Sequence, residues 1–309
     1  MLNFAHCMIK DYVKDGGQMN IARCNRIRFG AFPRFLETNY NRSMNILIVA
    51  EDLDRQAIDH SRILYYLRPY RRIRVVANYR RQHEWLLSWY NQVVDLYAMR
   101  YIRGEARYPN FVEWIHERYH EFRQVHAIEV AARYRNSGKF ESVDILDLHG
   151  EKDLLEDLFC NYVPSAKATC AGVKHWVMNS TKSNRGRTHD YDRLATKAFL
   201  RGKLKNYHAA IASKVARRIE DAAAKRGFFK GDHYPKICLN RTFLGTLLQI
   251  EMDQERTYFP DRYESRGGDA ALRQEFEHAA RHKLCSMDDE KILASGLFDP
   301  IFKQLNGLS

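Results

Sequence analysis

The chain alternates short apolar runs with longer amphipathic segments. Three runs are almost continuously apolar or β-branched, namely "MNILIVA" (44–50), "IRVVAN" (73–78) and "SVDILDL" (142–148). Runs of this length and composition are typical of strands that are buried on both faces of a sheet. Because segments of helical periodicity separate them, the pattern predicts an α/β fold in which a parallel sheet is flanked by helices.

Apolar residues at helical spacing predict helices over 53–67, 82–97, 109–122, 125–138 and 151–160. Beyond residue 188 the pattern is almost wholly helical, and "STKSNRGRTHD" (180–190) is the most loop-like stretch. We therefore expect a single domain over 1–309. It would hold an α/β core over 40–175 and a helical elaboration over 188–309.

The ends of the three expected strands are where a ligand would bind, because open parallel sheets bind ligands outside the carboxyl ends of their strands. Glu51 follows the first run, Arg80 and Arg81 follow the second, and His149 follows the third. These polar residues are the first candidates for a functional site.

The chain of 309 residues carries a net charge of +12, and 45% of its residues are hydrophobic. This balance favours anionic partners, such as phosphate-bearing cofactors, acidic glycans or nucleic acid. No apolar run reaches the 18 residues of a membrane span, and the first residues are too polar for a signal peptide. The sequence therefore predicts no membrane segment and carries no address for a compartment.

The six cysteines are scattered and form no CxxC pair, which argues against a zinc ribbon or a thioredoxin-type site. Cys160 and Cys170 are close enough in sequence to close a small disulfide loop in an oxidising compartment, and two buried thiols are the equal alternative. Glycosylation sequons begin at Asn41, Asn179 and Asn240, but such triplets are common by chance and decide nothing alone.

The segment "RIRVVANYRRQHEWLLSWYNQVV" (72–94) places an arginine pair between an expected strand and an expected helix. The helix would turn its amino-terminal N–H groups toward the same place, which suits an anion. Helical spacing puts Ser88 on the polar face, where a hydroxyl could add a directional donor to the charge of an arginine. A phosphate site and a solvated surface of arginines with a serine both remain open at this point.

This segment resembles the 3′-phosphate-binding segment of sulfotransferases that use 3′-phosphoadenosine-5′-phosphosulfate (PAPS). In that family a strand ends in an arginine, often within Arg-Asp-Pro, and a serine follows eight residues later on the next helix. Arg80 and Ser88 have that spacing, and "SWYNQ" is similar to the family's helix. The resemblance spans roughly residues 40 to 175 and includes "VDILDLHGEKDLLEDLFCNYVPSAKATC", which looks like a later strand, helix and cysteine-containing loop of a carbohydrate-type branch.

The resemblance implies a P-loop NTPase-like fold and transfer of a sulfuryl group from PAPS to a hydroxyl or amine, on a carbohydrate acceptor. It implies that Arg80 and Ser88 hold the 3′-phosphate. Glu51 is the first candidate for the general base, and His149 and His83 are weaker candidates that read more simply as polar residues at element ends. The Golgi lumen is the compartment that the resemblance would suggest.

The chain departs from the family pattern in two places. Arg81-Gln82 stands where the family often has Asp-Pro, and no strand followed by a Lys-x-Gly-Thr-Thr-like loop precedes the first expected strand. That loop cradles the 5′-phosphosulfate in the family. We therefore expect either an enzyme that is incomplete at its amino terminus or a relative that has lost catalysis and kept the 3′-phosphate half-site.

Two alternatives have their own signals. His116-Glu117-x-x-His120 matches the zincin pattern, in which two histidines on one helix face bind zinc and the glutamate acts as base. Charged Arg118 inside the motif is unusual for a buried zincin helix, Glu141 is the plausible third ligand, and we expect no metal. Nucleic-acid binding would suit the charge, but no RNP-like segment, zinc finger or KH loop is present, so we do not expect it.

Overall fold

The computed structural model describes residues 31–42, 46–48, 53, 58–105, 107–149, 154–163, 166–173, 190–205, 207, 212–228 and 234–307. The chain divides into two compact units. Unit 1 comprises residues 1–80 and 120–178, and unit 2 comprises residues 81–119 and 179–309. Each unit is described by itself, and the prediction of one domain over 1–309 stays a prediction.

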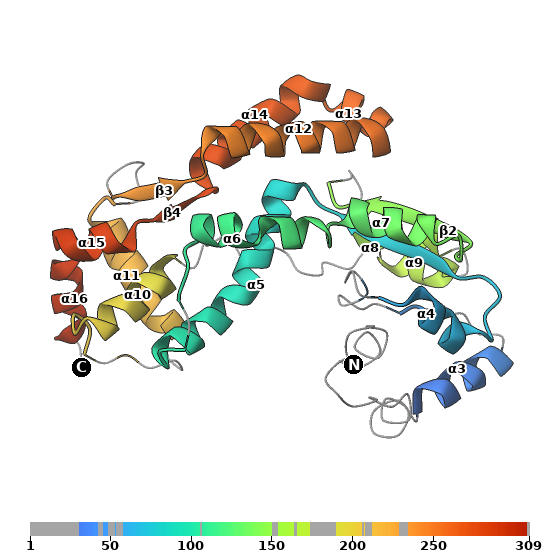
Figure 1. Cartoon of the computed structure of the whole chain (residues 1–309), viewed down its shortest axis with the longest axis horizontal. Coiled ribbons are helices and arrows are strands. Elements are labelled where there is room, and N and C mark those ends of the chain that lie inside the picture. The colour runs from blue at the N-terminus through green and yellow to red at the C-terminus, as the bar shows by residue number, and fades with distance from the viewer. Residues whose placement is uncertain are drawn as a thin grey trace. The chain divides into compact units, whose positions relative to one another are not determined.

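Unit 1 is built on two parallel strands, β1 (Arg74–Tyr79) and β2 (Ser142–Asp147) (Figure 1). Their register pairs Arg74 with Ser142 at one end and Tyr79 with Asp147 at the other. Both strands were predicted from their apolar runs, and their parallel pairing confirms the coarse assignment of a mixed α/β chain.

Helices pack against these strands and against each other in unit 1. Helix α7 contacts both β1 and β2. Its residues Val130 and Tyr134 join a hydrophobic cluster to which β1 and β2 contribute Val75 and Val143. The helical elements of this unit are α3 (Ala31–Asn41), α4 (His60–Leu67), α7 (Ala127–Asn136), α8 (Leu154–Asp157), the π-helical turn η4 (Leu158–Tyr162) and α9 (Lys167–Val173).

The predicted strand over 44–50 is wrong for the part that the structure describes. Residues 46–48 belong to no strand, while 44–45 and 49–50 lie outside the described residues. Ile46 and Ile48 are partly buried and pack against the hydrophobic cluster of unit 1, whereas Leu47 is exposed, so these three residues bury alternate side chains without belonging to a strand. An apolar run in a sequence indicates that its side chains are buried. It does not by itself show that the backbone pairs with a neighbouring strand.

Of the predicted helix over 53–67, the structure shows α4 (His60–Leu67), while residues 54–57 lie outside the described residues. Helix α4 begins at His60, and the side chain of Asp59 accepts a hydrogen bond of 3.0 Å from the Ser61 N–H group. An aspartate at this position satisfies an N–H group that has no partner inside the helix. Asp59 therefore marks the start of α4 within the predicted segment.

Unit 2 is mostly helical, as the pattern beyond residue 188 predicted. Its helices are α5 (Gln82–Ile102), most of α6 (Phe111–Arg123), α10 (Asp190–Leu200), α11 (Ala212–Lys225), α12 (Arg241–Tyr258), α13 (Pro260–Ser265), α14 (Gly268–His282), α15 (Asp289–Ser295) and α16 (Asp299–Asn306). Helices α12, α13 and α14 contact one another, and α10, α11, α15 and α16 gather around a second hydrophobic core (Figure 1). The predicted helices over 82–97 and 109–122 are confirmed as α5 and α6.

Two short strands that were not predicted join the helices of unit 2. Strands β3 (Lys236–Cys238) and β4 (Cys285–Met287) pair antiparallel, and a disulfide links Cys238 to Cys285. In unit 1 a second disulfide links Cys160 to Cys170, which decides between the two alternatives that the sequence left open. Among the described residues, one covalent cross-link therefore lies in each unit.

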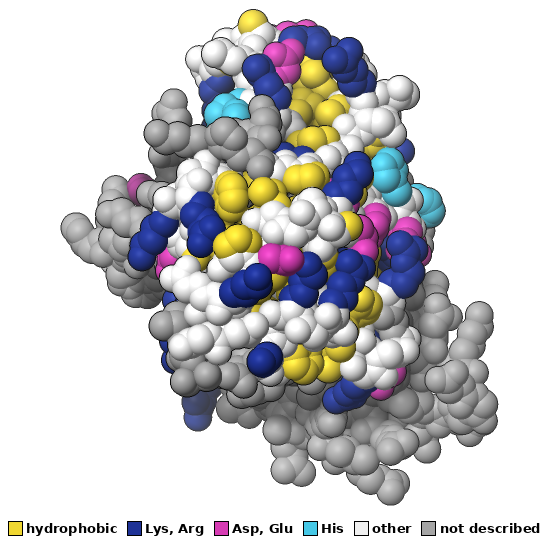
Figure 2. All heavy atoms as spheres, turned by 90° about the vertical axis from the view of Figure 1, so that its left-hand side faces the viewer, with side chains coloured by type: hydrophobic (Ala, Val, Ile, Leu, Met, Phe, Trp, Pro, Cys, Tyr) yellow, Lys and Arg dark blue, Asp and Glu magenta, His cyan; other side chains and the backbone are white. Residues whose placement is uncertain are grey.

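On the face shown in Figure 2, Lys and Arg side chains lie among hydrophobic patches and fewer acidic side chains. Within the described ranges, every helix is too short or too polar to span a lipid bilayer.

Candidate functional site

The carboxyl ends of β1 and β2 lie at one edge of the sheet in unit 1. Tyr79 pairs with Asp147 as the last residue of each strand, and the Leu148 N–H group donates to the Tyr79 carbonyl at 3.0 Å. Arg80 and His149 therefore leave the sheet at the same edge. The sequence predicted this convergence from the parallel order of the strands.

A buried histidine holds the backbone at Arg80. The Nε2 atom of His126 lies 2.9 Å from the Arg80 carbonyl oxygen, and because a carbonyl can only accept, Nε2 carries the proton. The His126 ring is 1% exposed and packs edge-on against the Tyr79 ring at 5.5 Å. Burial lowers the pKa of His126 to about 4, partly offset by the bond to the Arg80 carbonyl, so the imidazole is neutral at pH 7.

Arg80 and Ser88 keep their polar groups available. Both residues are half-buried, Arg80 between β1 and α5 and Ser88 within α5. Neither the Arg80 guanidinium nor the Ser88 hydroxyl makes a hydrogen bond or ion pair with the part of the chain that the structure describes. Arg80 is the last residue of the segment 1–80 of unit 1, and Ser88 belongs to unit 2. The position of each residue is therefore described only within its own unit.

Arg81, the second member of the arginine pair, has a structural role in unit 2. Its guanidinium is 6% exposed and donates to Glu255 of α12 through Nε at 2.6 Å and Nη2 at 3.2 Å, with a further ion pair to Glu275 of α14. Burial alone would lower the pKa of Arg81, but these two carboxylates outweigh it and raise the pKa above its ordinary value. The two neighbouring arginines therefore differ. The Arg81 guanidinium is held by ion pairs inside unit 2, whereas the Arg80 guanidinium has no partner among the described residues.

The amino terminus of α5 already holds an anionic group in unit 2. Glu251 of α12 accepts a hydrogen bond of 2.7 Å from the His83 N–H group, and its other oxygen lies 2.9 Å from His83 Nδ1. Both side chains are almost completely buried. The dipole of α5 thus stabilises an internal carboxylate, which gives His83 a structural role in unit 2.

Of the two remaining candidates for a general base, the structure describes one. Glu51 lies outside the described residues. His149 is half-buried just beyond β2, where its N–H group donates to Asp147 at 2.9 Å. The structure therefore brings His149 to the sheet edge of Arg80 and leaves the role of Glu51 a prediction.

The zincin-like motif lies on α6, where His116, Glu117 and His120 are all exposed. Glu117 accepts a hydrogen bond from Arg107 at 3.1 Å, and Glu141, the proposed third ligand, pairs with Arg74 at 3.2 Å. Among the residues that the structure describes, no three His, Cys, Asp or Glu side chains gather in a way that could hold a metal. Nothing in these contacts supports the metalloprotease alternative.

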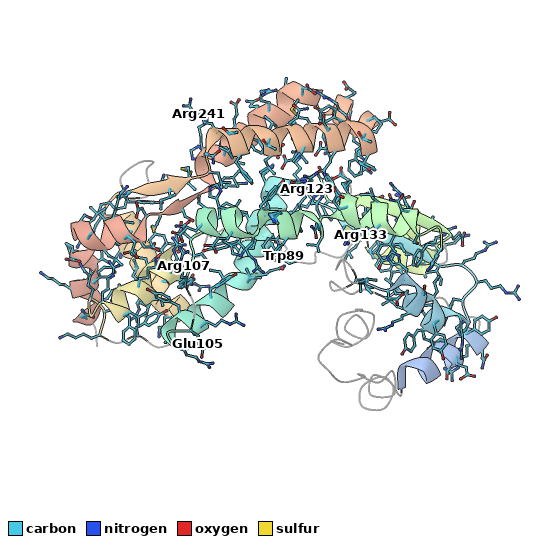
Figure 3. The ribbon with its side chains drawn as sticks, viewed as in Figure 1. Trp89, Glu105, Arg107, Arg123, Arg133 and Arg241 are labelled. Atoms are coloured by element: carbon cyan, nitrogen blue, oxygen red, sulfur yellow. A yellow bond between two sulfur atoms is a disulfide. The ribbon has the colours of Figure 1, made fainter. Side chains whose placement is uncertain are left out.

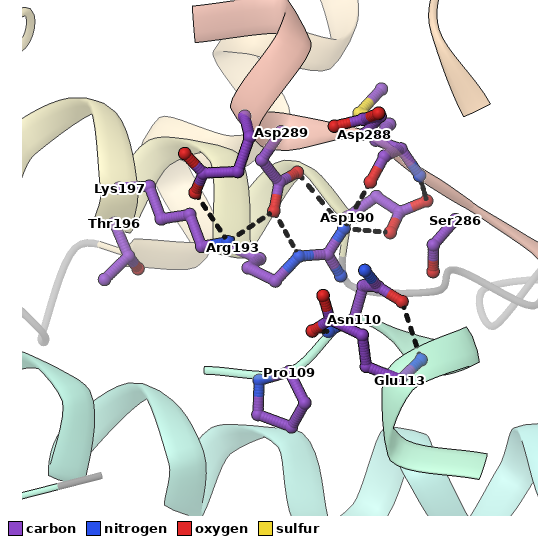
Figure 4. Close-up of polar contacts among 12 residues, drawn as sticks. Pro109, Asn110, Glu113, Asp190, Arg193, Thr196, Lys197, Ser286, Asp288 and Asp289 are labelled. Atoms are coloured by element: carbon purple, nitrogen blue, oxygen red, sulfur yellow. Dashed lines mark hydrogen bonds and ion pairs between the residues drawn. The ribbon is translucent and has the colours of Figure 1, made fainter. Parts of the chain in front are cut away.

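A buried polar cluster of unit 2 surrounds Arg193 of α10 (Figure 4). This side chain is 0% exposed and donates to Asp190 at 2.8 Å, to Asp289 at 3.1 Å and to the Tyr90 hydroxyl at 3.2 Å. The Asp190 carboxylate also accepts from the Met287 N–H group at 3.1 Å. These contacts join α10 to α5, β4 and α15, which indicates a structural role for the cluster within unit 2.

Reasoning from the sequence missed both His126 and Arg193. His126 stands alone before an amphipathic helix, and Arg193 is one of many arginines in a basic helical region. The bond from His126 to Arg80 and the bonds from Arg193 to Asp289 and Tyr90 join residues that are distant in sequence, so no local pattern marks these contacts. Comparison with protein-family models, with curated proteins and with solved structures finds no match to this chain.

Proposed function

We propose that this chain binds PAPS and is a sulfotransferase-like protein that transfers a sulfuryl group to a hydroxyl or amine, on a carbohydrate acceptor. The observation that carries the proposal is Arg80, which leaves the carboxyl end of a parallel strand with an available guanidinium. The proposal includes a P-loop NTPase-like arrangement around β1 and β2. The net charge of +12 supports an anionic ligand of this kind.

Several contacts support Arg80 as a ligand-binding residue. The bond from neutral His126 restrains its backbone without consuming its side-chain donors. A guanidinium with free donors can bind two oxygens of a phosphate at once, which a serine or backbone donor cannot. His126 is therefore a positioning residue in this proposal, and Arg80 is the residue that contacts the phosphate.

Ser88 would supply the second donor to the 3′-phosphate. It lies on α5, eight residues after Arg80, and its hydroxyl has no partner among the described residues. PAPS brings an activated sulfur–oxygen bond, so the residues of the chain need to bind and orient it and to accept one proton from the acceptor group. Glu51 is proposed to accept that proton.

The proposal is tested by thermal unfolding with and without adenosine 3′,5′-bisphosphate, because a ligand that binds only the folded chain raises the melting temperature. Arg80→Ala should weaken binding by about 1.5–3 kcal/mol, the range for a hydrogen bond to a charged group. Ser88→Ala should weaken it by about 0.5–1.5 kcal/mol. The matched control is Arg72→Ala, since Arg72 is an exposed arginine that precedes β1.

Equal affinity of the wild-type chain, Arg80→Ala and Ser88→Ala for the bisphosphate would overturn the assignment of the phosphate site. Equal weakening by Arg72→Ala would also count against it, because the effect would then report net charge. Stabilisation by zinc that is lost in His116→Ala would favour the metalloprotease alternative instead.

A further inference from the structure

The sequon Asn240-Arg241-Thr242 lies at the start of α12 in unit 2. All three residues are exposed. Arg241, the middle residue, lies at the outer surface where α12 begins (Figure 3). Of the three sequons in the chain, this is the one whose residues are all described, since Ser43 of the first and Asn179 of the second lie outside the described residues.

Asn240 is the amino-terminal cap of α12, and this role orients its side-chain amide. The backbone is extended, with φ −70° and ψ 156°, and the Oδ1 atom accepts a hydrogen bond of 2.8 Å from the Phe243 N–H group. Capping uses the oxygen and leaves the Nδ2 nitrogen out of the helix. The atom that an N-linked sugar would modify is therefore the one that the fold does not need.

The cysteines indicate the compartment in which the chain folds. Both cross-links of the described residues are formed, Cys160–Cys170 in unit 1 and Cys238–Cys285 in unit 2. Cytosolic proteins keep such thiols reduced, whereas secretory compartments allow disulfides. Cys238 lies two residues before Asn240, so the cross-link and the sequon share one short segment.

We propose that Asn240 carries an N-linked glycan. In the transfer step the Nδ2 nitrogen forms a bond to the anomeric carbon of an oligosaccharide that is linked to a lipid pyrophosphate. The bond from that carbon to the pyrophosphate oxygen breaks, the lipid pyrophosphate leaves, and Nδ2 loses one proton to a base of the transferring enzyme. No oxidant or reductant is needed.

The folded unit accommodates the product. The modified side chain is still an amide whose Oδ1 can accept from Phe243, so α12 keeps its cap. The exposed surroundings of the sequon leave space for the sugar. This inference rests on exposure, capping and the disulfides, and it holds whether or not the chain binds PAPS.

The test is expression of the whole chain through the secretory pathway of a eukaryotic cell, followed by mass spectrometry of the peptide that contains Asn240, before and after enzymatic removal of N-glycans. The same digest, without reduction, reports the Cys238–Cys285 cross-link. We expect the glycan on wild-type and Thr242→Ser chains. We expect none on Thr242→Ala, which destroys the sequon and keeps the capping residue.

Asn240→Asp is the control for structure, because aspartate caps a helix as well as asparagine and cannot accept the sugar. It should lose the glycan and retain the far-ultraviolet circular dichroism and the disulfide of the wild-type chain. An unmodified Asn240 peptide in molecules whose Cys238–Cys285 cross-link has formed would overturn the proposal. Free thiols at both cysteines in the secreted chain would overturn it as well, because its argument for an oxidising compartment would fail.

Discussion

At the scale of the residue, His126 shows how one buried imidazole restrains a candidate site. Its pKa of about 4 lies below the ordinary value near 6.5 because burial disfavours the charged ring. The neutral ring is what allows the bond to the Arg80 carbonyl to persist without a buried charge. Protonating the ring in the folded chain would place a cation among apolar side chains.

The difference between the pKa of His126 in the folded chain and its ordinary value predicts that the chain loses stability in acid. Between pH 6.5 and pH 4 the unfolded chain binds a proton at His126 that the folded chain does not, so the free energy of unfolding falls as the pH falls. The part of the free energy of unfolding that depends on a neutral His126 is fully present above about pH 6.5. About 3 kcal/mol of it is lost by the time the pH reaches about 4. Urea unfolding of the wild-type chain across this range measures the slope.

His126→Gln should remove this part of the slope, because its amide can donate to the Arg80 carbonyl and does not titrate. The control is His116→Gln, which removes an exposed imidazole from α6. If His126→Gln retained the full wild-type slope, the proton uptake would belong to another group.

At the scale of the element, α5 begins where α12 supplies a carboxylate. The sequence predicted α5 from its apolar spacing and gave no indication of what would hold its amino terminus. Glu251 does so through the N–H group and ring of His83, more than 160 residues away along the chain. An anion at a helix start is stabilised by the helix dipole and by N–H groups that lack partners inside the helix.

Glu251→Ala should therefore lower the free energy of unfolding by about 1.5–3 kcal/mol, because it leaves buried donors of His83 without a charged acceptor. Asp253→Ala is the matched control on the same helix, since Asp253 is an exposed acid that contacts only the neighbouring turns. We expect that control to stay within about 0.5 kcal/mol of the wild-type chain. Equal effects of the two substitutions in urea unfolding would contradict the role of Glu251.

At the scale of the whole molecule, each unit has its own hydrophobic core and its own disulfide. The Cys160–Cys170 cross-link closes a separation of 10 residues, and the Cys238–Cys285 cross-link closes one of 47. Closing a loop reduces the entropy of the unfolded chain, by an amount that increases with loop length.

Replacing Cys160 and Cys170 by serine should destabilise unit 1 by about 3 kcal/mol, and replacing Cys238 and Cys285 should destabilise unit 2 by about 4 kcal/mol. Hydrogen exchange read by mass spectrometry measures both units in one experiment. Faster exchange should be confined to the unit that has lost its cross-link. Uniform acceleration over both units in either variant would show that they unfold as one.

The sequence by itself determined the elements whose signals are local. Strands β1 and β2 are short runs that contain β-branched and other apolar residues, and α5, α6 and α7 repeat apolar residues at helical spacing, so each was predicted within a few residues of its place. The order of these elements was also sufficient to place Arg80 and His149 after neighbouring parallel strands. The spacing from Arg80 to Ser88 is likewise a property of the chain alone.

Only the tertiary structure decided what each polar group does. Arg80 and Arg81 are adjacent and chemically identical in the sequence, yet α12 and α14 place Glu255 and Glu275 against Arg81 and leave the guanidinium of Arg80 without a partner among the described residues. The pairing of Cys238 with Cys285 and the burial of His126 depend in the same way on distant segments. The physical reason is that backbone geometry follows local sequence, whereas desolvation, charge pairing and disulfide formation depend on which remote residues the fold brings into contact.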